Sequence, residues 1–314
     1  MSDVGSLSPE GPPQISPPSA ERGVFHTHSL LFVLLRIGMY FALAEGVSFA
    51  LQWIMVALSA GEISIYSPKI LTISEGSSLA GAFAAGIAMS QLEGRSFADY
   101  GLPLHGAFGK LFWQGALFGL VEISSVLGVI ATFGSYHFGG LGIHGADLLR
   151  WAAFWGAFFV LVGLYEEFAF RGYVQFTLAQ AVGFWPAAVL LSVAFGFVHR
   201  SNPGESKMGL AGVVLTGLLW CFSLRRTGNL WFAVGMHASF DFGETFLYSV
   251  PDSGVVFRGH LSNATLAGPA WLTGGSAGPE GSVCDFAMLL IFFYVFHRLY
   301  PSRARARSSS PDSA

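Results

Sequence analysis

Long apolar runs, separated by short polar or glycine-rich stretches, dominate the chain between positions 30 and 300. A helix that crosses a lipid bilayer needs about 20 mostly apolar residues, and most of these runs approach that length. The runs therefore predict an all-α fold, a polytopic membrane helix bundle of about eight transmembrane helices. The predicted helices cover residues 30–58, 70–90, 111–133, 151–180, 184–199, 210–224, 230–248 and 283–300.

Three segments lie outside these helices and differ from them in composition. Residues 1–28 are rich in Pro, Ser and Gly without an early apolar stretch, which predicts a disordered tail and no cleavable signal peptide. Residues 251–281 are rich in Gly, Ser, Ala and Pro, which predicts an irregular or mobile loop. Residues 301–314 form a basic C-terminal tail. The predicted organisation is a transmembrane bundle at 29–300 between two tails.

The composition agrees with a membrane protein. Hydrophobic residues make up 53% of the chain and charged residues only 11%, whereas soluble domains carry roughly a quarter charged residues. The net charge of −3 gives no reason to expect a nucleic-acid partner. The two cysteines, Cys221 and Cys284, lie in apolar runs and form no C-x-x-C pair, so we interpret them as reduced packing residues.

An even number of membrane helices places both termini on the same side of the membrane. The Lys and Arg residues of the connecting segments and tails are divided unevenly between that side and the other. Nine fall on the side of both termini: Arg22, Arg95, Lys110, Arg225, Arg226, Arg298, Arg303, Arg305 and Arg307. Five fall on the other side: Lys69, Arg150, Arg200, Lys207 and Arg258. Because cytoplasmic loops carry the excess of basic residues, both termini of this multi-pass protein of the cell membrane are predicted to be cytoplasmic.

Ionisable groups at membrane depth are costly and usually functional. Single acids such as Glu45 and Glu122 are interpreted as groups near an interface or hydrogen-bonded to a neighbouring helix. The adjacent Glu166 and Glu167 are harder to explain, because two carboxylates in an apolar helix need compensation. Glu167 stands four residues before Arg171, the favoured spacing for a helical ion pair. Glu166 then points elsewhere and is free for other chemistry, unless both acids only pair with basic groups.

Two further clusters contain histidine. Phe195 and His199 share one face of a predicted helix, although a lone histidine at a helix end is usually structural. His237 and Asp241 are one helical turn apart, and such a pair can polarise the imidazole, ligate a metal or orient a water. For this pair, structural and functional interpretations stand equally open.

The predicted depths of these groups favour a common site. The turn between the fourth and fifth helices lies near 181–183, with Glu166 and His199 each about 16 residues, or roughly 24 Å, away from it. His237 is only about 9 residues, or roughly 14 Å, from the turn at 227–228, so helix tilt or a deeper turn must supply the difference. A carboxylate and two imidazoles in an apolar cavity can activate a water and stabilise an oxyanion, which is what amide hydrolysis requires.

The motifs Glu-Glu-x-x-x-Arg, Phe-x-x-x-His and His-x-x-x-Asn/Asp, in this order on successive apolar helices, resemble the CPBP family. This family comprises the CAAX prenyl proteases type 2 and the bacteriocin-processing (Abi) intramembrane proteases. The resembling region covers about residues 151–248, and the family fold is a bundle of about eight membrane helices. The resemblance implies a general base at Glu166, a supporting pair at Glu167 and Arg171, and a water-activating His199. It also implies an oxyanion-facing pair at His237 and Asp241.

Position 241 departs from the prenyl-protein proteases, where Asn is usual. An ionised Asp cannot donate a hydrogen bond to an oxyanion, so Asp241 must be protonated, orient His237 or bind a metal. The departure argues against prenyl-protein processing more than it argues against hydrolysis. No H-E-x-x-H motif is present, yet two histidines and two acids could hold Zn²⁺. The possible zinc ligands are Glu166, His199, His237 and Asp241.

The hypothesis that follows is a membrane-embedded endopeptidase, of the metallo- or glutamate type, that cleaves a peptide or protein substrate near or within the bilayer. The substrate is expected with or without a covalently attached lipid, and membrane lipid is the other expected partner. The first alternative is a catalytically silent relative that binds a peptide, as an immunity-type protein would. The second is an ion-coupled transporter that uses the buried carboxylates, but it gains no support because the sequence contains no internal repeat.

Overall fold

The computed structural model describes residues 29–59 and 67–301, and most of these residues are helical. The α-helices are α1 (Leu30–Ala57), α2 (Pro68–Leu92), α3 (Lys110–Thr132), α4 (Gly145–Glu167), α5 (Val174–Val182), α6 (Phe184–His199), α7 (Lys207–Thr227), α8 (Trp231–Phe242), α9 (Ala270–Thr273) and α10 (Val283–Leu299). Short 3₁₀ turns are η2 (Phe97–Tyr100), η3 (Leu104–Gly106) and η6 (Pro279–Gly281), and π turns are η4 (Phe168–Tyr173) and η5 (Gly243–Leu247). Two short strands are β1 (Tyr136–His137) and β2 (Thr265–Leu266).

Each of the eight predicted spans coincides with a helix or a pair of consecutive helices. Five helical segments of the described chain are long and apolar enough to cross a bilayer: α1, α2, α3, α7 and the continuous segment Gly145–Val182, which contains α4 and α5. The segments α6, α8 and α10 are shorter. The prediction of a polytopic helical membrane bundle is confirmed. The predicted tail at 1–28 and nearly all of that at 301–314 lie outside the described residues.

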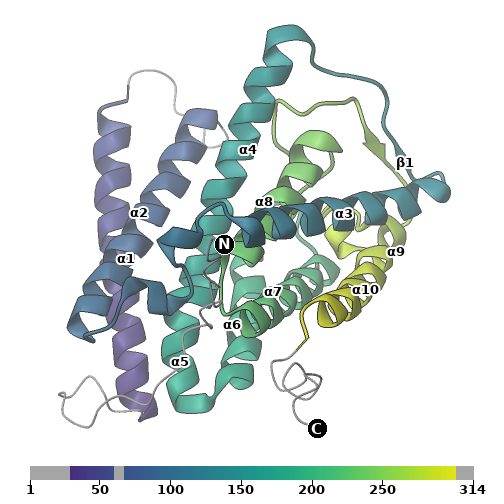
Figure 1. Cartoon of the computed structure of the whole chain (residues 1–314). Coiled ribbons are helices and arrows are strands. Elements are labelled where there is room, and N and C mark those ends of the chain that lie inside the picture. The colour runs from purple at the N-terminus through teal and green to yellow at the C-terminus, as the bar shows by residue number, and fades with distance from the viewer. Residues whose placement is uncertain (1–28, 60–66, 302–314) are drawn as a thin grey trace, which may run out of the picture.

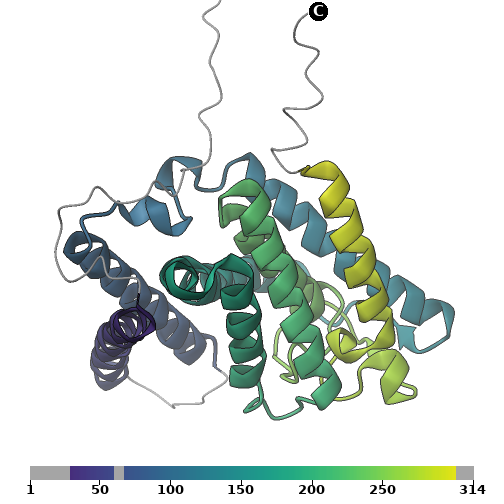
Figure 2. The same ribbon diagram turned by 90° about the horizontal axis from the view of Figure 1, so that it is seen from below.

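The bundle has two sides that meet at the α4–α5 segment. Helices α1 and α2 pack together on one side, while α7 and α10 lie together on the other (Figures 1 and 2). Helix α3 packs along α8, which in turn packs on α4, and α6 packs on α7. Parts of α2, α4, α6, α7 and α8 surround one cavity of the interior.

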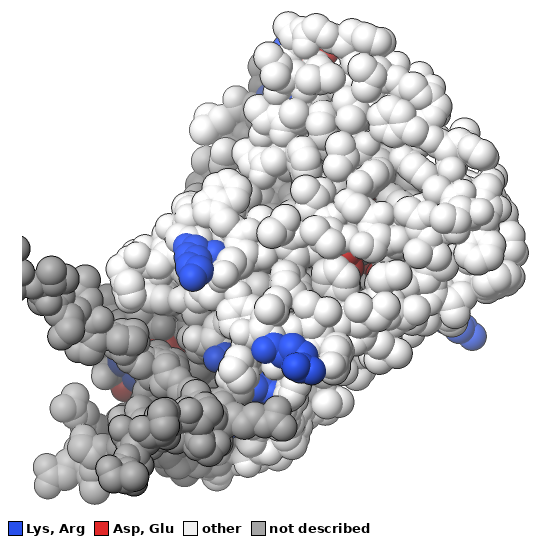
Figure 3. Space-filling view, turned by 45° about the vertical axis from the view of Figure 1, so that its right-hand side comes forward, with Lys and Arg blue, Asp and Glu red and all other residues white. Residues whose placement is uncertain are grey.

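The outer surface is the kind that lipid solvates. Large apolar side chains of α1 point outward, with Phe49 72% and Trp53 68% exposed. On the face shown in Figure 3 most of the surface carries neither basic nor acidic side chains. Many exposed large apolar side chains together with so few charged ones are expected for a protein whose solvent is a bilayer.

Glycines allow α3 and α8 to approach closely. Gly115 and Gly119 lie one turn apart on α3, and a side chain at either position would collide with backbone carbonyls of α8. Gly235 of α8 faces the backbone of α3 in the same way. Small residues at such spacing are the usual means of close packing between membrane helices. This packing holds α8, with His237 and Asp241, against the bundle.

The 251–281 segment has little regular structure, as its composition predicts. It contains β2, α9 and η6, and β2 pairs antiparallel with β1, with Tyr136 opposite Leu266. Residues near its two ends, among them Ser253, Val255 and Glu280, line the cavity next to α8. The segment therefore contributes to the wall of the candidate site.

Candidate active site

The α4–α5 segment changes its helical geometry directly after Glu166 and Glu167. The backbone from Phe168 to Tyr173 forms a π turn, and Gly172 is non-helical (φ −84°, ψ −119°). A side chain at Gly172 would press against the ring of Phe168, so the kink requires a glycine. π turns inside α-helices are frequent at functional sites because they turn side chains away from their regular direction.

Glu167 and Arg171 form the ion pair expected from their spacing. Arg171 Nη1 lies 3.1 Å from Glu167 Oε1, and both side chains are 0% exposed. The guanidinium carbon of Arg171 also lies 4.2 Å from the ring centre of Phe195 and 5.2 Å from that of Trp220. The aromatic faces and the carboxylate together replace the water that a buried guanidinium would lose.

His237 lies at the centre of a group of carboxylates. Its Nδ1 is 3.1 Å from Glu167 Oε1, while its Nε2 is 3.6 Å from Glu166 Oε2 and 3.3 Å from Asp241 Oδ2. The indole of Trp220 stacks on the imidazole, with ring centres 4.2 Å apart and planes at 17°. Because a neutral imidazole donates from only one nitrogen, carboxylates at both nitrogens are best satisfied by the imidazolium.

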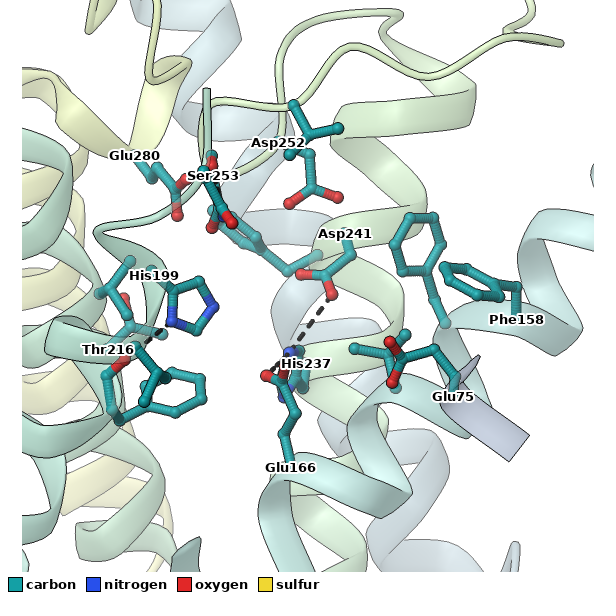
Figure 4. A pocket seen from close by; sticks show the side chains of 18 of the residues that line it. Glu75, Phe158, Glu166, His199, Thr216, His237, Asp241, Asp252, Ser253 and Glu280 are labelled. Carbon is teal, nitrogen blue, oxygen red and sulfur yellow. Dashed lines mark hydrogen bonds and ion pairs between the residues drawn. The ribbon is translucent and has the colours of Figure 1, made fainter. Parts of the chain in front are cut away.

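His199 presents the opposite arrangement. Its Nδ1 donates a hydrogen bond to the carbonyl oxygen of Phe195 at 2.8 Å, which leaves Nε2 as an acceptor. Figure 4 places His199 across the cavity from Glu166 and His237. The two histidines therefore offer different chemistry: one ring can accept a proton or hydrogen bond, and the other can donate.

All four predicted catalytic residues line one cavity of about 260 Å³. Glu166 comes from α4, His199 from α6, and His237 and Asp241 from α8. Much of the remaining wall is apolar and includes Phe158 of α4. Such a cavity can exclude bulk water from a reacting peptide bond while keeping a few polar groups in place.

The turns between helices explain why these residues meet. Gly183, at φ +86°, separates α5 from α6 at the predicted position. The turn before α8 is deeper than a surface turn, since Leu230 is fully buried and its N–H donates to the carbonyl of Gly101. Trp231 also donates from its indole N–H to the carbonyl of Pro103. The position of this turn and the tilt of α8 together bring His237 Nε2 to 3.6 Å from Glu166 Oε2.

Several cavity residues were missed by sequence reasoning. Glu75 of α2 was noted only as an ionisable group at membrane depth, and nothing in the sequence singled out Trp220. Asp252 and Glu280 lie in the loop, about 30 residues apart in the chain, and both line the cavity. Burial, and after it the negative charges of other carboxylates, raises the pKa of Asp252 and that of Glu280 well above their ordinary values. Asp252 and Glu280 lie close to other acids only in the folded protein, so the sequence offered no signal that would have identified them.

The predicted zinc ligands do not form the most compact set of donors. Three side-chain ligand atoms lie within 4.8 Å of one another in one set of the described residues, Glu244, Asp252 and Glu280. The predicted ligands are instead bound to partners or separated across the cavity, as both nitrogens of His237 face carboxylates. Three of the four predicted ligands meet at His237 Nε2, which Glu166 and Asp241 both approach, while His199 lies across the cavity, so a zinc site at these four residues stays a prediction.

Residues 148–243 match the family model described as Rce1-like, type II CAAX prenyl endopeptidase Rce1-like. The matched region covers about a third of the chain and contains all six predicted site residues. The match agrees with the resemblance to the CPBP family that the three motifs carry in the same region. Comparison with proteins of curated description and with solved structures found no match for the chain.

Proposed function

Because residues 148–243 resemble a type II CAAX prenyl endopeptidase and the chain is a multi-pass membrane protein, we propose that it hydrolyses a peptide bond with a water activated by Glu166. The observation that carries this proposal is the cavity in which Glu166 and His199 face each other beside His237 (Figure 4). Its apolar wall and few polar groups suit a peptide segment that enters from the membrane.

In the proposed reaction, a water lies between Glu166 and His199. The Nε2 atom of His199 accepts a hydrogen bond from this water, and the Glu166 carboxylate takes its proton as the oxygen attacks the scissile carbonyl carbon. The carbonyl π bond opens and its electron pair moves to the oxygen, which becomes an oxyanion. The Nε2–H of protonated His237, which faces Asp241 in the free protein, turns to that oxyanion and stabilises it. Glu166 then returns the proton to the leaving amine as the C–N bond breaks.

Three groups keep His237 in place in this mechanism. Glu167 holds Nδ1, Trp220 stacks on the ring, and Asp241 approaches Nε2. The negative charge of Asp241 favours the protonated ring that must face the oxyanion. We therefore propose that Asp241 is a positioning residue that acts through His237, rather than an oxyanion donor itself.

Asp241→Asn tests this role, because it keeps the shape of the side chain and removes its charge. We expect kcat for peptide cleavage to fall by at least about tenfold with little change in KM, since histidine-orienting carboxylates typically contribute this much. Asp147→Asn is the matched control: Asp147 lies on the surface in an ion pair with Arg150 and should keep full activity. Unchanged or higher activity in Asp241→Asn would instead assign to position 241 a direct donation to the oxyanion.

The substrate class is tested with purified protein in detergent or lipid nanodiscs and a panel of quenched peptides. The panel contains C-terminal CAAX-type peptides with and without a prenyl group, together with unrelated apolar peptides. Cleavage of any of them that survives chelator treatment supports a glutamate-activated endopeptidase, and preference for the prenylated forms supports a lipidated substrate. Activity lost with chelator and restored by Zn²⁺ would favour the metallopeptidase alternative.

Absence of cleavage across the panel would favour the silent, peptide-binding alternative, in which the same cavity holds a peptide without hydrolysing it. A peptide bound by both wild-type protein and Glu166→Gln, and cleaved by neither, is the result expected of such a protein. Ion uptake into vesicles that contain the protein would instead favour a transporter. Peptide binding without cleavage and ion uptake therefore distinguish the two alternatives from each other and from a peptidase.

The orientation of the protein in the cell membrane is tested with reporter fusions. The Lys and Arg bias of the connecting segments leads us to propose that both termini are cytoplasmic. A reporter after Ala314 should then be active only as a cytoplasmic reporter, and one inserted near Trp271, which is 59% exposed in the loop, only as an external reporter. A C-terminal reporter that is active outside the cell would overturn this orientation.

A further inference from the structure

Three carboxylates that the proposed mechanism does not use gather beside the cavity. Glu244 lies in η5 directly after α8, Asp252 near the start of the 251–281 segment, and Glu280 near its end. One ligand oxygen from each lies within 4.8 Å of the other two. Figure 4 shows Asp252 and Glu280 beyond Asp241, on the side of the cavity away from Glu166.

Three of the six carboxylate oxygens of this cluster are buried without a hydrogen-bond partner. Both carboxylate oxygens of Glu244 and one of Glu280 are buried without a partner, and Glu244 is 0% exposed. Asp252 accepts a hydrogen bond from the hydroxyl of Thr245 at 2.9 Å through one oxygen. Buried polar atoms without partners need an explanation, and at Glu244 a cation shared with the two neighbouring carboxylates would supply one.

The charge of the cluster is not balanced by the protein. Among the residues described, no Lys or Arg forms an ion pair with Glu244, Asp252 or Glu280. The charges that act on Glu280 come from other acids, Asp252 and Glu205 foremost. Carboxylates at this separation repel one another strongly when ionised, so a positive group is the natural complement of their charged form.

We infer that Glu244, Asp252 and Glu280 form a binding site for a hard divalent cation of the Ca²⁺ or Mg²⁺ class. Carboxylate oxygen is the donor that these cations prefer, and the set contains no sulfur or imidazole. Three atoms no more than 4.8 Å apart lie within about 2.8 Å of a common centre, so small side-chain movements reach the 2.3–2.6 Å of calcium coordination. Water or backbone carbonyls complete the shell.

Such a cation would join parts of the chain that the site depends on. It would tie both ends of the 251–281 segment to the turn that follows His237 and Asp241 on α8. The segment contributes Ser253 and Val255 to the cavity wall. The cation therefore stabilises the wall and the position of α8, and it takes no part in the attack on the peptide bond. This inference does not depend on the proposed hydrolysis.

The test is direct binding to the full-length protein. Purified protein is treated with EDTA, desalted and titrated with CaCl₂, MgCl₂ or MnCl₂, with isothermal titration calorimetry for all three and electron paramagnetic resonance for Mn²⁺. We expect one equivalent to bind and the apparent melting temperature to rise by about 3–6 °C at a hundredfold excess over Kd.

Glu280→Gln and Asp252→Asn should lose that binding and the cation-dependent rise. In EDTA the same variants should melt at or above the wild-type temperature, because each substitution removes a repelling charge and keeps the side-chain shape. Glu122→Gln is the matched control. Glu122 is equally buried with both oxygens unpartnered, but it lies in α3 outside the set, so this variant should bind the cation normally.

Two results would overturn the inference. One is a wild-type protein that binds none of the three cations and does not change its melting temperature. The other is binding that Glu280→Gln and Asp252→Asn leave intact. Zn²⁺ binding lost in His199→Ala but kept in Glu280→Gln would assign the metal to the histidine cavity instead, and that result bears on the proposed hydrolysis rather than on this site.

Discussion

Glu166→Gln is expected to abolish peptide hydrolysis and to leave the fold intact. The amide has the same shape and still hydrogen-bonds, but it cannot take a proton from the attacking water. Loss of a general base lowers kcat by about 10²–10⁴-fold. Glu166 is the least buried of the three carboxylates around His237, with 20% of its side chain exposed, so neutralising it leaves no stranded partner in the core. The measurement is the cleavage rate of the best panel peptide by purified protein of confirmed monodispersity.

Double substitutions test whether Glu166 acts as one unit with His199 and His237. His199→Ala and His237→Ala should each be similarly inactive, and adding Glu166→Gln to either should cost little more, because groups that act as a unit have non-additive effects. A fully active Glu166→Gln would remove Glu166 from the base role. Glu75 of α2, another acid on the cavity wall, is then the candidate to examine.

Arg171→Ala is expected to reduce the yield of folded protein severely. Arg171 is fully buried and compensates Glu167, and its guanidinium fills the space between Phe195 and Trp220. Removing one partner of a buried ion pair costs about 3–5 kcal/mol, because the remaining charge is left without compensation. The measurements are the monodisperse fraction on size-exclusion chromatography and the apparent melting temperature, both compared with Glu166→Gln.

A double variant separates charge from packing. Glu167→Gln with Arg171→Met removes both charges and keeps most of the volume, and neutral replacements of this kind are often tolerated. We expect it to recover much of the folded yield that Arg171→Ala loses. The double variant should still cleave poorly, because Glu167 also holds Nδ1 of His237. Near-native yield for Arg171→Ala alone would show that the ion pair contributes little to folding.

The helices were predictable because the bilayer imposes a simple rule on the sequence. A helix that crosses lipid needs a long apolar run, and all eight predicted runs are helical in the structure. The spacing of Glu167 and Arg171 was equally informative, since side chains four residues apart on a helix are neighbours whatever surrounds them. The π turn after Glu167 and the kink at Gly172 were not predicted, because they depend on how Phe168 and its neighbours pack.

The sequence by itself determined the fold class, the order of the three motifs and the approximate depth of Glu166 and His199, since these follow from distances along a single helix or between two helices joined by a tight turn. Tertiary structure alone decided what each group touches. The buried turn at Leu230 sets the depth of α8, and the rotation of that helix brings His237 between Glu166, Glu167 and Asp241. Trp220 and the Glu244–Asp252–Glu280 cluster join from segments far away in the chain. Contacts of this kind depend on helix rotation, depth and loop path, and no local periodicity in the sequence encodes these three quantities.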